Sequence, residues 1–260
     1  NFSILSEKIK LKTTLMTIIK AKAIDMSLMK NDFKSLLLFS ISIISYYQMF
    51  IKNIIGSIEK YRFSIFKIIF YEVLFTIKGF KGNKVDFINS KDFADNIPCP
   101  YYFLVKIKKF LDKNKINSFI DLGSGSGRTI YFFKRYFDIK FYGIELFKES
   151  YTSSTNLFSN DKNIQIINDD FRNLNFLNLE ADCFFLNEPL KNRKDFELVV
   201  KAIEKKNNNI NKKFFVILIN VTDQDLKHFS SLELKDSNII GKNRSDIHGG
   251  GPRGYYIFSN

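Results

Sequence analysis

The sequence predicts an α/β domain, in which helices cover a mostly parallel sheet, preceded by a helical extension. Two observations predict this fold class. From about residue 101, short apolar runs alternate with segments of helical periodicity, which is the pattern of βαβ units. A glycine-rich turn then follows the first apolar run, where a strand gives way to a helix. We expect residues 97–260 to form the domain and residues 1–96 the extension.

Seven apolar runs are candidate strands, and five segments are candidate helices. The strands are expected at 117–122, 140–145, 163–168, 182–187, 213–220, 232–239 and 254–259. The helices are expected at 101–113, 127–137, 148–159, 194–206 and 223–230. Because no clear helix separates the last two strands, we expect them to form an antiparallel hairpin at the edge of the sheet.

The extension contains two apolar stretches. Residues 35–51 carry no charged side chain, and their 17 residues reach the lower limit for a membrane-spanning helix; the alternative is a buried or interfacial helix. Residues 61–80 predict an amphipathic helix that lies on a membrane or packs on the next domain. Its apolar residues at helical spacing are Phe63, Phe66, Phe70, Val73, Leu74 and Ile77. Residues 81–100 are rich in turn-formers and indicate a linker.

Composition limits the partners and the compartment. The net charge of +13 favours association with nucleic acid or an anionic membrane surface, although a Lys-rich and Trp-free composition also fits a nucleotide bias. Two cysteines and two histidines predict neither a disulfide framework nor a metal site. We therefore expect a cytoplasmic protein, attached to the inner face of a membrane if the extension binds one.

The glycine turn indicates the ligand. Gly123, Gly125 and Gly127 follow Asp121, and glycines permit close approach of a ligand to the backbone. A dinucleotide fingerprint requires glycine where Arg128 stands, and a carboxylate before the turn would repel a pyrophosphate. An acid suits a cation instead, so we predict S-adenosylmethionine, which carries an ammonium and a sulfonium. An NAD-dependent oxidoreductase is the alternative.

Acids at the ends of the next two strands extend this site. Glu145 lies 18 residues after Gly127, at the tip of the second strand, where a carboxylate accepts both hydroxyls of a ribose. Asp170 follows the third strand and is expected to accept from the adenine amino group. Phe171 then covers the ring face. Because parallel strands end at one edge of a sheet, we expect these groups to share one cavity.

The segment from about 97 to 260 resembles the class I S-adenosylmethionine-dependent methyltransferases. The stretches "DLGSGSGR", "GIEL" and "INDDF" are similar to the first three motifs of that family. The resemblance implies a Rossmann-like sheet of seven strands with a reversed last strand. It also implies cofactor contacts by Asp121, Gly123, Gly125, Gly127, Glu145 and Asp170. Residue 169 is commonly glycine in the family and is Asp here.

Two further stretches narrow the resemblance. "IPCPYYFLVKIKKFL" is similar to a segment of small bacterial methyltransferases and of the lysine methyltransferases of ATP-synthase c-subunits. Asn187, Glu188 and Pro189 follow the fourth strand, where the family's amino-methylating enzymes hold the acceptor nitrogen with an Asn or Asp before prolines and an aromatic. Leu190 replaces the aromatic, which disfavours stacking on a flipped base. The alternative is an ordinary Asn–Pro turn.

The sequence therefore predicts an S-adenosylmethionine-dependent methyltransferase that acts on a nitrogen, with a protein lysine as the acceptor. Glu188 would attract the lysine ammonium before deprotonation. The alternatives are an RNA or DNA methyltransferase, which the charge of +13 supports, and a cofactor-binding module without catalysis. A membrane surface is a further expected partner, through the N-terminal helices.

Overall fold

The computed structural model describes residues 58–85, 92–93, 95–187, 190–209, 212–221, 223–240 and 254–260. Residues Lys60–Asn260 form one compact unit. This unit takes in most of helix α3 (Ile58–Ile77), which the sequence analysis assigned to the N-terminal extension. The apolar stretch 35–51 lies outside the described residues.

One seven-stranded sheet organises the unit, in the order β3-β2-β1-β4-β5-β7-β6. Its strands are β1 (Ser118–Leu122), β2 (Lys140–Ile144), β3 (Ile164–Ile167), β4 (Cys183–Asn187), β5 (Phe215–Ile219), β6 (Glu233–Ile239) and β7 (Gly254–Ser259). The first five are parallel, and β7 lies antiparallel between β5 and β6. The predicted α/β sheet with a C-terminal antiparallel hairpin is confirmed.

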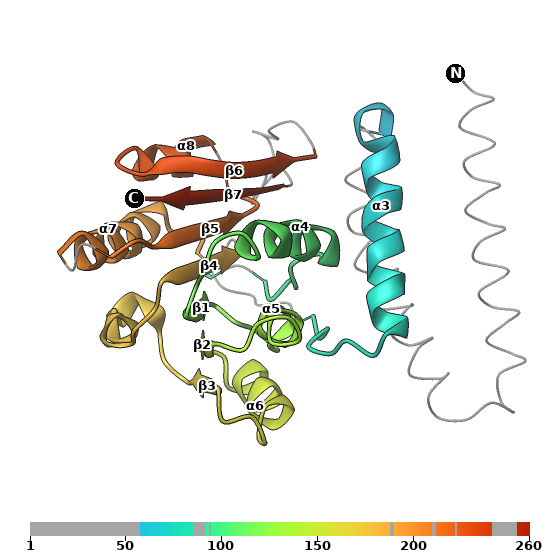
Figure 1. Ribbon diagram of the computed structural model, residues 1–260, viewed down its shortest axis with the longest axis horizontal. Helices are drawn as coiled ribbons and strands as arrows, with labels where there is room; N and C mark the ends of the chain where they lie inside the picture. Colours follow the sequence, from blue (N-terminus) through green and yellow to red (C-terminus); the bar gives the residue numbers. More distant parts are fainter. Residues whose placement is uncertain are drawn as a thin grey trace, which may run out of the picture. The chain divides into compact units, whose positions relative to one another are not determined.

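Helices cover both faces of the sheet (Figure 1). One face carries α4 (Tyr101–Leu111), α5 (Arg128–Phe133) and α6 (Lys148–Leu157). The other carries α7 (Arg193–Asn209), α8 (Asp223–Leu226) and the short 3₁₀ turns η2 (Phe171–Asn173), η3 (Asn175–Asn178) and η4 (Lys227–Phe229). Each predicted helix has a counterpart, whereas η2 and η3 follow β3 in a stretch without helical periodicity.

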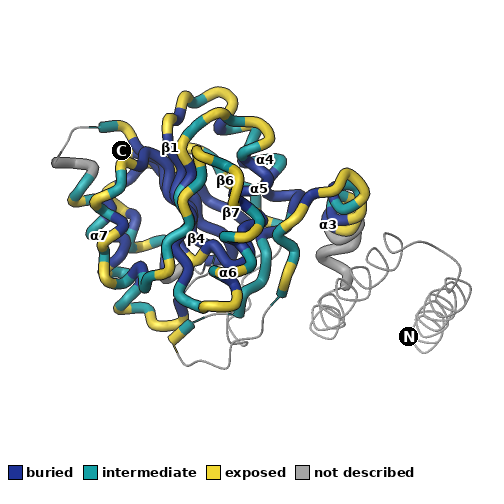
Figure 2. The backbone as a smooth tube through the Cα atoms, turned by 90° about the horizontal axis from the view of Figure 1, so that it is seen from below, coloured by how far each residue is buried: buried dark blue, intermediate teal, exposed yellow. Residues whose placement is uncertain are grey.

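The central strands β1, β4 and β5 are buried on both sides, as a helix-covered parallel sheet requires. Ile120 and Phe184 belong to the core that packs under α7. Phe119, the residue before Ile120, points to the opposite face of the sheet, where its ring lies 5.1 Å from that of Phe133 in α5. Figure 2 shows the central strands buried within the unit. Burial on both sides explains why these strands appear in the sequence as continuous apolar runs.

Helix α3 packs on the unit through one of its faces. Ile68 and Phe75 are buried, and the Phe75 ring lies 4.9 Å from that of Tyr101 and 5.4 Å from that of Phe132. Among the described helices, none combines the length and the apolar character that a membrane crossing needs.

Candidate active site

A cavity opens where β1, β2 and β4 end, at the point where the chain leaves the sheet in opposite directions. Ligands of open α/β sheets bind at this switch point. The space inside, including its open mouth, measures about 680 Å³. Five of the residues predicted from the sequence line it: Asp121, Gly123, Glu145, Phe171 and Asn187.

The glycine turn forms one wall of this cavity. All three glycines have positive φ, with 82° at Gly123, 54° at Gly125 and 89° at Gly127, a region that side chains with a Cβ rarely enter. A Cβ on Gly125 would stand 2.2 Å from the Asn96 amide oxygen, and one on Gly127 would stand 2.7 Å from the Phe158 ring. Gly125 therefore allows the turn to approach Asn96 of the cavity lining, Gly127 allows it to approach Phe158, and Gly123 lines the cavity itself.

Glu145 holds the turn against the end of β2. Its Oε2 accepts from the backbone N–H of Gly125 at 2.7 Å, and its Oε1 accepts from the N–H of Phe147 at 2.8 Å. Each carboxylate oxygen has two lone pairs and can accept more than one hydrogen bond. The side chain lines the cavity and is buried, so the ribose contact predicted for Glu145 is sterically available.

Asp121 makes the cavity electrostatically suited to a cation. The side chain is only 2% exposed. Burial raises the pKa of Asp121 well above its usual range, the neighbouring Glu145 carboxylate raises it further, and a hydrogen bond from Thr129 partly offsets both effects. Two buried acids beside one cavity favour a bound positive charge, which would lower that pKa again.

The turn also contains a buried hydroxyl group, that of Ser124. Ser124 Oγ is buried, and among the described residues it has no hydrogen-bond partner. Ser124 is one of the residues around the cavity, with Asp121 and Glu145. Its hydroxyl lies close to Gly143, so the Ser124 side chain stands behind the turn rather than in the cavity. The turn and the two acids together fit the polar groups of S-adenosylmethionine.

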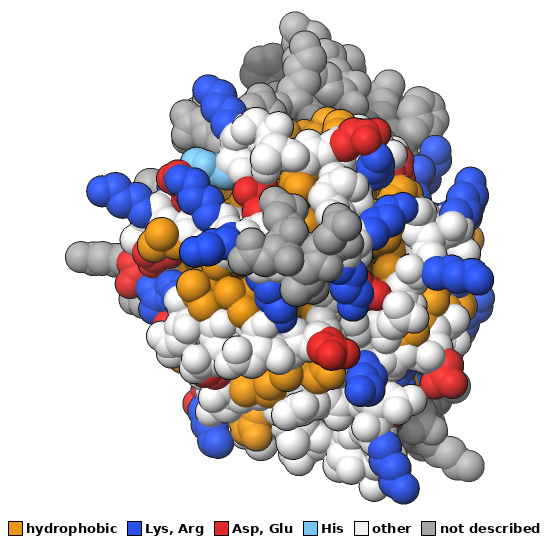
Figure 3. Space-filling model, turned by 60° about the vertical axis from the view of Figure 1, so that its left-hand side comes forward, with side chains coloured by type: hydrophobic (Ala, Val, Ile, Leu, Met, Phe, Trp, Pro, Cys, Tyr) orange, Lys and Arg blue, Asp and Glu red, His pale blue; other side chains and the backbone are white. Residues whose placement is uncertain are grey.

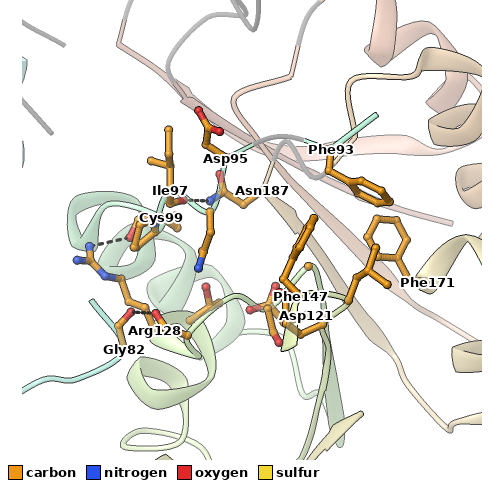
Figure 4. A pocket seen from close by; sticks show the side chains of 18 residues that line it. Gly82, Phe93, Asp95, Ile97, Cys99, Asp121, Arg128, Phe147, Phe171 and Asn187 are labelled. Atoms are coloured by element: carbon orange, nitrogen blue, oxygen red, sulfur yellow. Dashed lines mark hydrogen bonds between the residues drawn. The ribbon is translucent and has the colours of Figure 1, made fainter. Parts of the chain in front are cut away.

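Aromatic side chains form one end of the cavity (Figure 4). Phe171 is buried, and the rings of Phe93 and Phe147 meet edge to face at 5.5 Å. A flat heteroaromatic ring is a suitable occupant for this end. Sequence reasoning missed Phe147, although its place two residues after Glu145 was a usable signal.

Asp170 lies outside this aromatic end. It is absent from the described residues that line the cavity. Its carboxylate accepts from the Arg172 backbone N–H at 2.9 Å and from the Arg172 guanidinium at 2.6 Å, which caps η2. The Asp170 carboxylate is thus already paired with the permanent cation of Arg172. The predicted contact of Asp170 with adenine stays a prediction.

The stretch that the sequence marks as a linker forms the opposite wall. Ile97 O accepts from Asn187 Nδ2 at 2.8 Å, and Asn96 Nδ2 donates to Ser150 Oγ at 3.1 Å. Phe93 pairs with Leu190 in an isolated antiparallel bridge. The segment thus connects the end of β4 to α6 across the cavity. Its turn-rich composition gave no signal for this role.

Arg128 lies at the end of the cavity opposite Phe93, Phe147 and Phe171 (Figure 4). Its guanidinium lies 2.8 Å from Glu72 Oε2 and 4.5 Å from the centre of the Tyr101 ring. Glu72 Oε1 also accepts from the Tyr101 backbone N–H at 2.8 Å. Both members of this ion pair are buried. The pair anchors α3 to the first residue after the glycine turn, and it neutralises the positive charge beside the cavity.

Of the three residues predicted to hold the acceptor, Asn187 alone is among the described residues. Asn187 is the last residue of β4 and lines the cavity. Glu188 and Pro189 lie outside the described residues.

Comparisons with known proteins agree with this geometry. Residues 120–206 match the family model of a methyltransferase domain. No curated protein sequence matches the chain significantly.

Several solved structures are similar to the chain. The N-methyltransferase NodS from Bradyrhizobium japonicum, in complex with S-adenosylhomocysteine, has 8% identity over 64% of this chain and 89% of that one, with a TM-score of 0.49. The methyltransferase domain of bacterial CtHen1 has 12% identity over 60% and 97%, with a TM-score of 0.46. Fibrillarin from Aeropyrum pernix, with natively bound S-adenosylmethionine, has 17% identity over 55% and 66%, with a TM-score of 0.39.

The family match covers the strands and turns that build the cavity. The cavity in turn offers the glycine turn and the buried acids that the cofactor's cationic groups require. On these two grounds the chain contains a methyltransferase domain, matched over residues 120–206, whose cavity fits S-adenosylmethionine as the cofactor.

Proposed function

We propose that the enzyme methylates a nitrogen, and that its acceptor is the side-chain amine of a protein lysine. The observation that carries this proposal is the charge of the cavity. Its charged residues among the described lining are Asp95, Asp121, Glu145 and Arg128, and Glu72 neutralises the arginine. Acidic side chains in the lining attract an ammonium group and repel a phosphate.

The orientation of the Asn187 amide supports a nitrogen acceptor. Its Nδ2 donates to Ile97 O at 2.8 Å, which makes Oδ1 the acceptor end of the amide. An oxygen acceptor at the end of β4 receives an N–H of the incoming amine and directs the nitrogen lone pair. Glu188, the next residue in sequence, is proposed to attract the lysine ammonium into the cavity.

The transfer itself demands little acid–base chemistry. The bound cofactor supplies a methyl group on a positively charged sulfur, which leaves as a neutral thioether. The lysine ammonium first gives a proton to water, and the neutral amine then forms the new N–C bond with its lone pair and becomes a methylammonium. Positioning by Asn187 Oδ1 and exclusion of water by the 95–99 segment are therefore the main contributions of the protein.

Nucleic acid is the competing acceptor because the net charge is +13. On the face shown in Figure 3, basic side chains stand among acidic and apolar ones and form no continuous basic strip. Binding of a polyanion is driven by such strips and weakens steeply with salt. The dispersed charge of this face and the acidic cavity favour the lysine.

The acceptor is tested by incubating the purified 260-residue chain with methyl-labelled S-adenosylmethionine and a lysate of the cells that produce it. We expect label that protease releases and nucleases do not, and that hydrolysis recovers as methyl-lysine. An Asn187→Ala variant serves as the catalytic control. Label that ribonuclease or deoxyribonuclease removes would overturn the lysine assignment, and cofactor binding without any labelled product would favour a binding module.

Asp121→Asn is expected to weaken S-adenosylmethionine binding about 10- to 100-fold, the worth of a hydrogen bond to a charged group. The same change should stabilise the free protein, because it removes a buried charge. Each kcal/mol gained raises the Tm of a domain this size by about 2–4 °C. Calorimetric titration and thermal unfolding measure the two effects, and a loss of both affinity and stability would contradict this role.

The pH dependence of the same residue follows from the raised pKa of Asp121. The folded protein holds this proton more tightly than the unfolded chain, so stability from this group is present at low pH and is lost as the pH rises toward the raised pKa. Binding of the cation has the opposite sign and strengthens as the pH rises through that pKa. In Asp121→Asn, both pH dependences should flatten, and unchanged profiles would assign them to another group.

A further inference from the structure

Three of the six apolar residues that the sequence predicts at helical spacing on α3 are exposed. Phe70 is 60% exposed, Val73 48% and Ile77 68%, and their spacing places them on one face of the helix as an apolar stripe. Singly exposed apolar residues are ordinary, whereas a contiguous row of three marks an interaction site. Figure 2 shows buried and exposed positions alternating along this helix.

The opposite face fixes α3 in this orientation. Ile68, Glu72 and Phe75 are buried, each less than 6% exposed. Glu72 accepts from the Tyr101 N–H and pairs with Arg128. Turning the stripe inward would leave both members of a buried ion pair without partners, at a large cost. The outward stripe is therefore a fixed surface of the domain.

The charges around the stripe have one sign. Lys67, Lys78 and Lys81 are exposed on α3 or directly after it. From residue 60 to 84 the only acid is Glu72, and its charge is buried against Arg128. An apolar face bordered by lysines is the signature of a helix that lies in the headgroup region of an anionic bilayer.

The chain before α3 continues the same character. The stretch 35–51 is uncharged and apolar, and only residues 52–57 separate it from α3. We propose that the stripe of Phe70, Val73 and Ile77, with Lys67 and Lys78, is a docking surface for an anionic lipid membrane. This inference does not depend on the identity of the methyl acceptor.

The test is cosedimentation of the full chain with vesicles. We expect binding to vesicles of phosphatidylcholine with 30% phosphatidylglycerol, weaker binding to phosphatidylcholine alone, and loss of binding as salt increases. The triple variant Phe70→Ser/Val73→Ser/Ile77→Ser should bind about tenfold or more weakly, because it removes the apolar area that the bilayer would bury. Lys67→Gln/Lys78→Gln should lose the preference for anionic lipid.

The control is Leu198→Ser/Leu234→Ser, which removes apolar side chains that are 63% and 49% exposed elsewhere on the domain. This variant should bind vesicles as the wild type does. Retained binding of S-adenosylhomocysteine verifies that each variant is folded.

Three results would overturn the proposal. The triple variant could bind vesicles as tightly as the wild type. The wild type could ignore vesicles while the triple variant becomes sensitive to protease within 35–51, which would make that stretch the partner of the stripe. A wild-type dimer that the triple variant converts to a monomer would make a second copy the partner.

Discussion

Asn187→Ala is expected to lower the rate of methyl transfer about 10²- to 10³-fold, the typical cost of removing one positioned polar group from a transition state, and to leave cofactor affinity nearly unchanged. The reason is the position of the amide. Asn187 stands at the end of β4, held by its bond to Ile97 O, whereas the polar contacts predicted for the cofactor come from the ends of β1 and β2. Single-turnover rates and calorimetric titration with S-adenosylhomocysteine separate the two effects.

Asn187→Asp is the matched control for this prediction. It retains an acceptor oxygen of the same size but replaces the N–H donor to Ile97 O with a second oxygen. We expect a rate between those of wild type and Asn187→Ala. If Asn187→Ala instead lost cofactor affinity and rate in equal measure, Asn187 would belong to the cofactor site rather than the acceptor site.

Glu72→Ala is expected to destabilise the protein by about 3–5 kcal/mol, because it leaves the buried Arg128 guanidinium without its counter-charge. The pair joins α3 to the residue that follows the glycine turn, so cofactor affinity should fall as well. Chemical denaturation measures the first effect. Calorimetric titration with S-adenosylhomocysteine, at a temperature where the variant is folded, measures the second.

Two variants test this explanation for Glu72. Lys108→Ala removes an exposed ion pair with Asp112, whose side chain is 42% exposed, and should cost less than about 1 kcal/mol. Glu72→Leu/Arg128→Met replaces both buried charges with apolar groups and should recover most of the lost stability. A Glu72→Ala variant no less stable than Lys108→Ala would show that the pair contributes little.

The fold was predictable because its determinants are local. Strands that are buried on both sides are continuous apolar runs, as in Phe215–Ile219, and the glycine turn marks the first change from strand to helix. The acids Asp121 and Glu145 were predictable for a related reason. Parallel topology brings the ends of neighbouring strands together, so their positions in sequence define their positions in space.

The remaining features depend on contacts between distant segments. The sequence predicted an apolar stripe on α3 but not the direction in which it faces. A charged residue, Glu72, lies at the centre of the buried face because Arg128 neutralises it. Asp170 is paired with Arg172, a local competitor whose geometry no spacing rule gives. The turn-rich segment that includes Ile97 becomes a cavity wall through a bond to Asn187, 90 residues away.

The most direct measurement is calorimetric titration of the wild-type chain with S-adenosylmethionine, S-adenosylhomocysteine and NAD at two pH values. If the buried acids recognise a cationic nucleoside, the two sulfur nucleosides bind, more tightly at the higher pH, and NAD does not. Binding of NAD with no binding of S-adenosylmethionine at either pH would contradict the account.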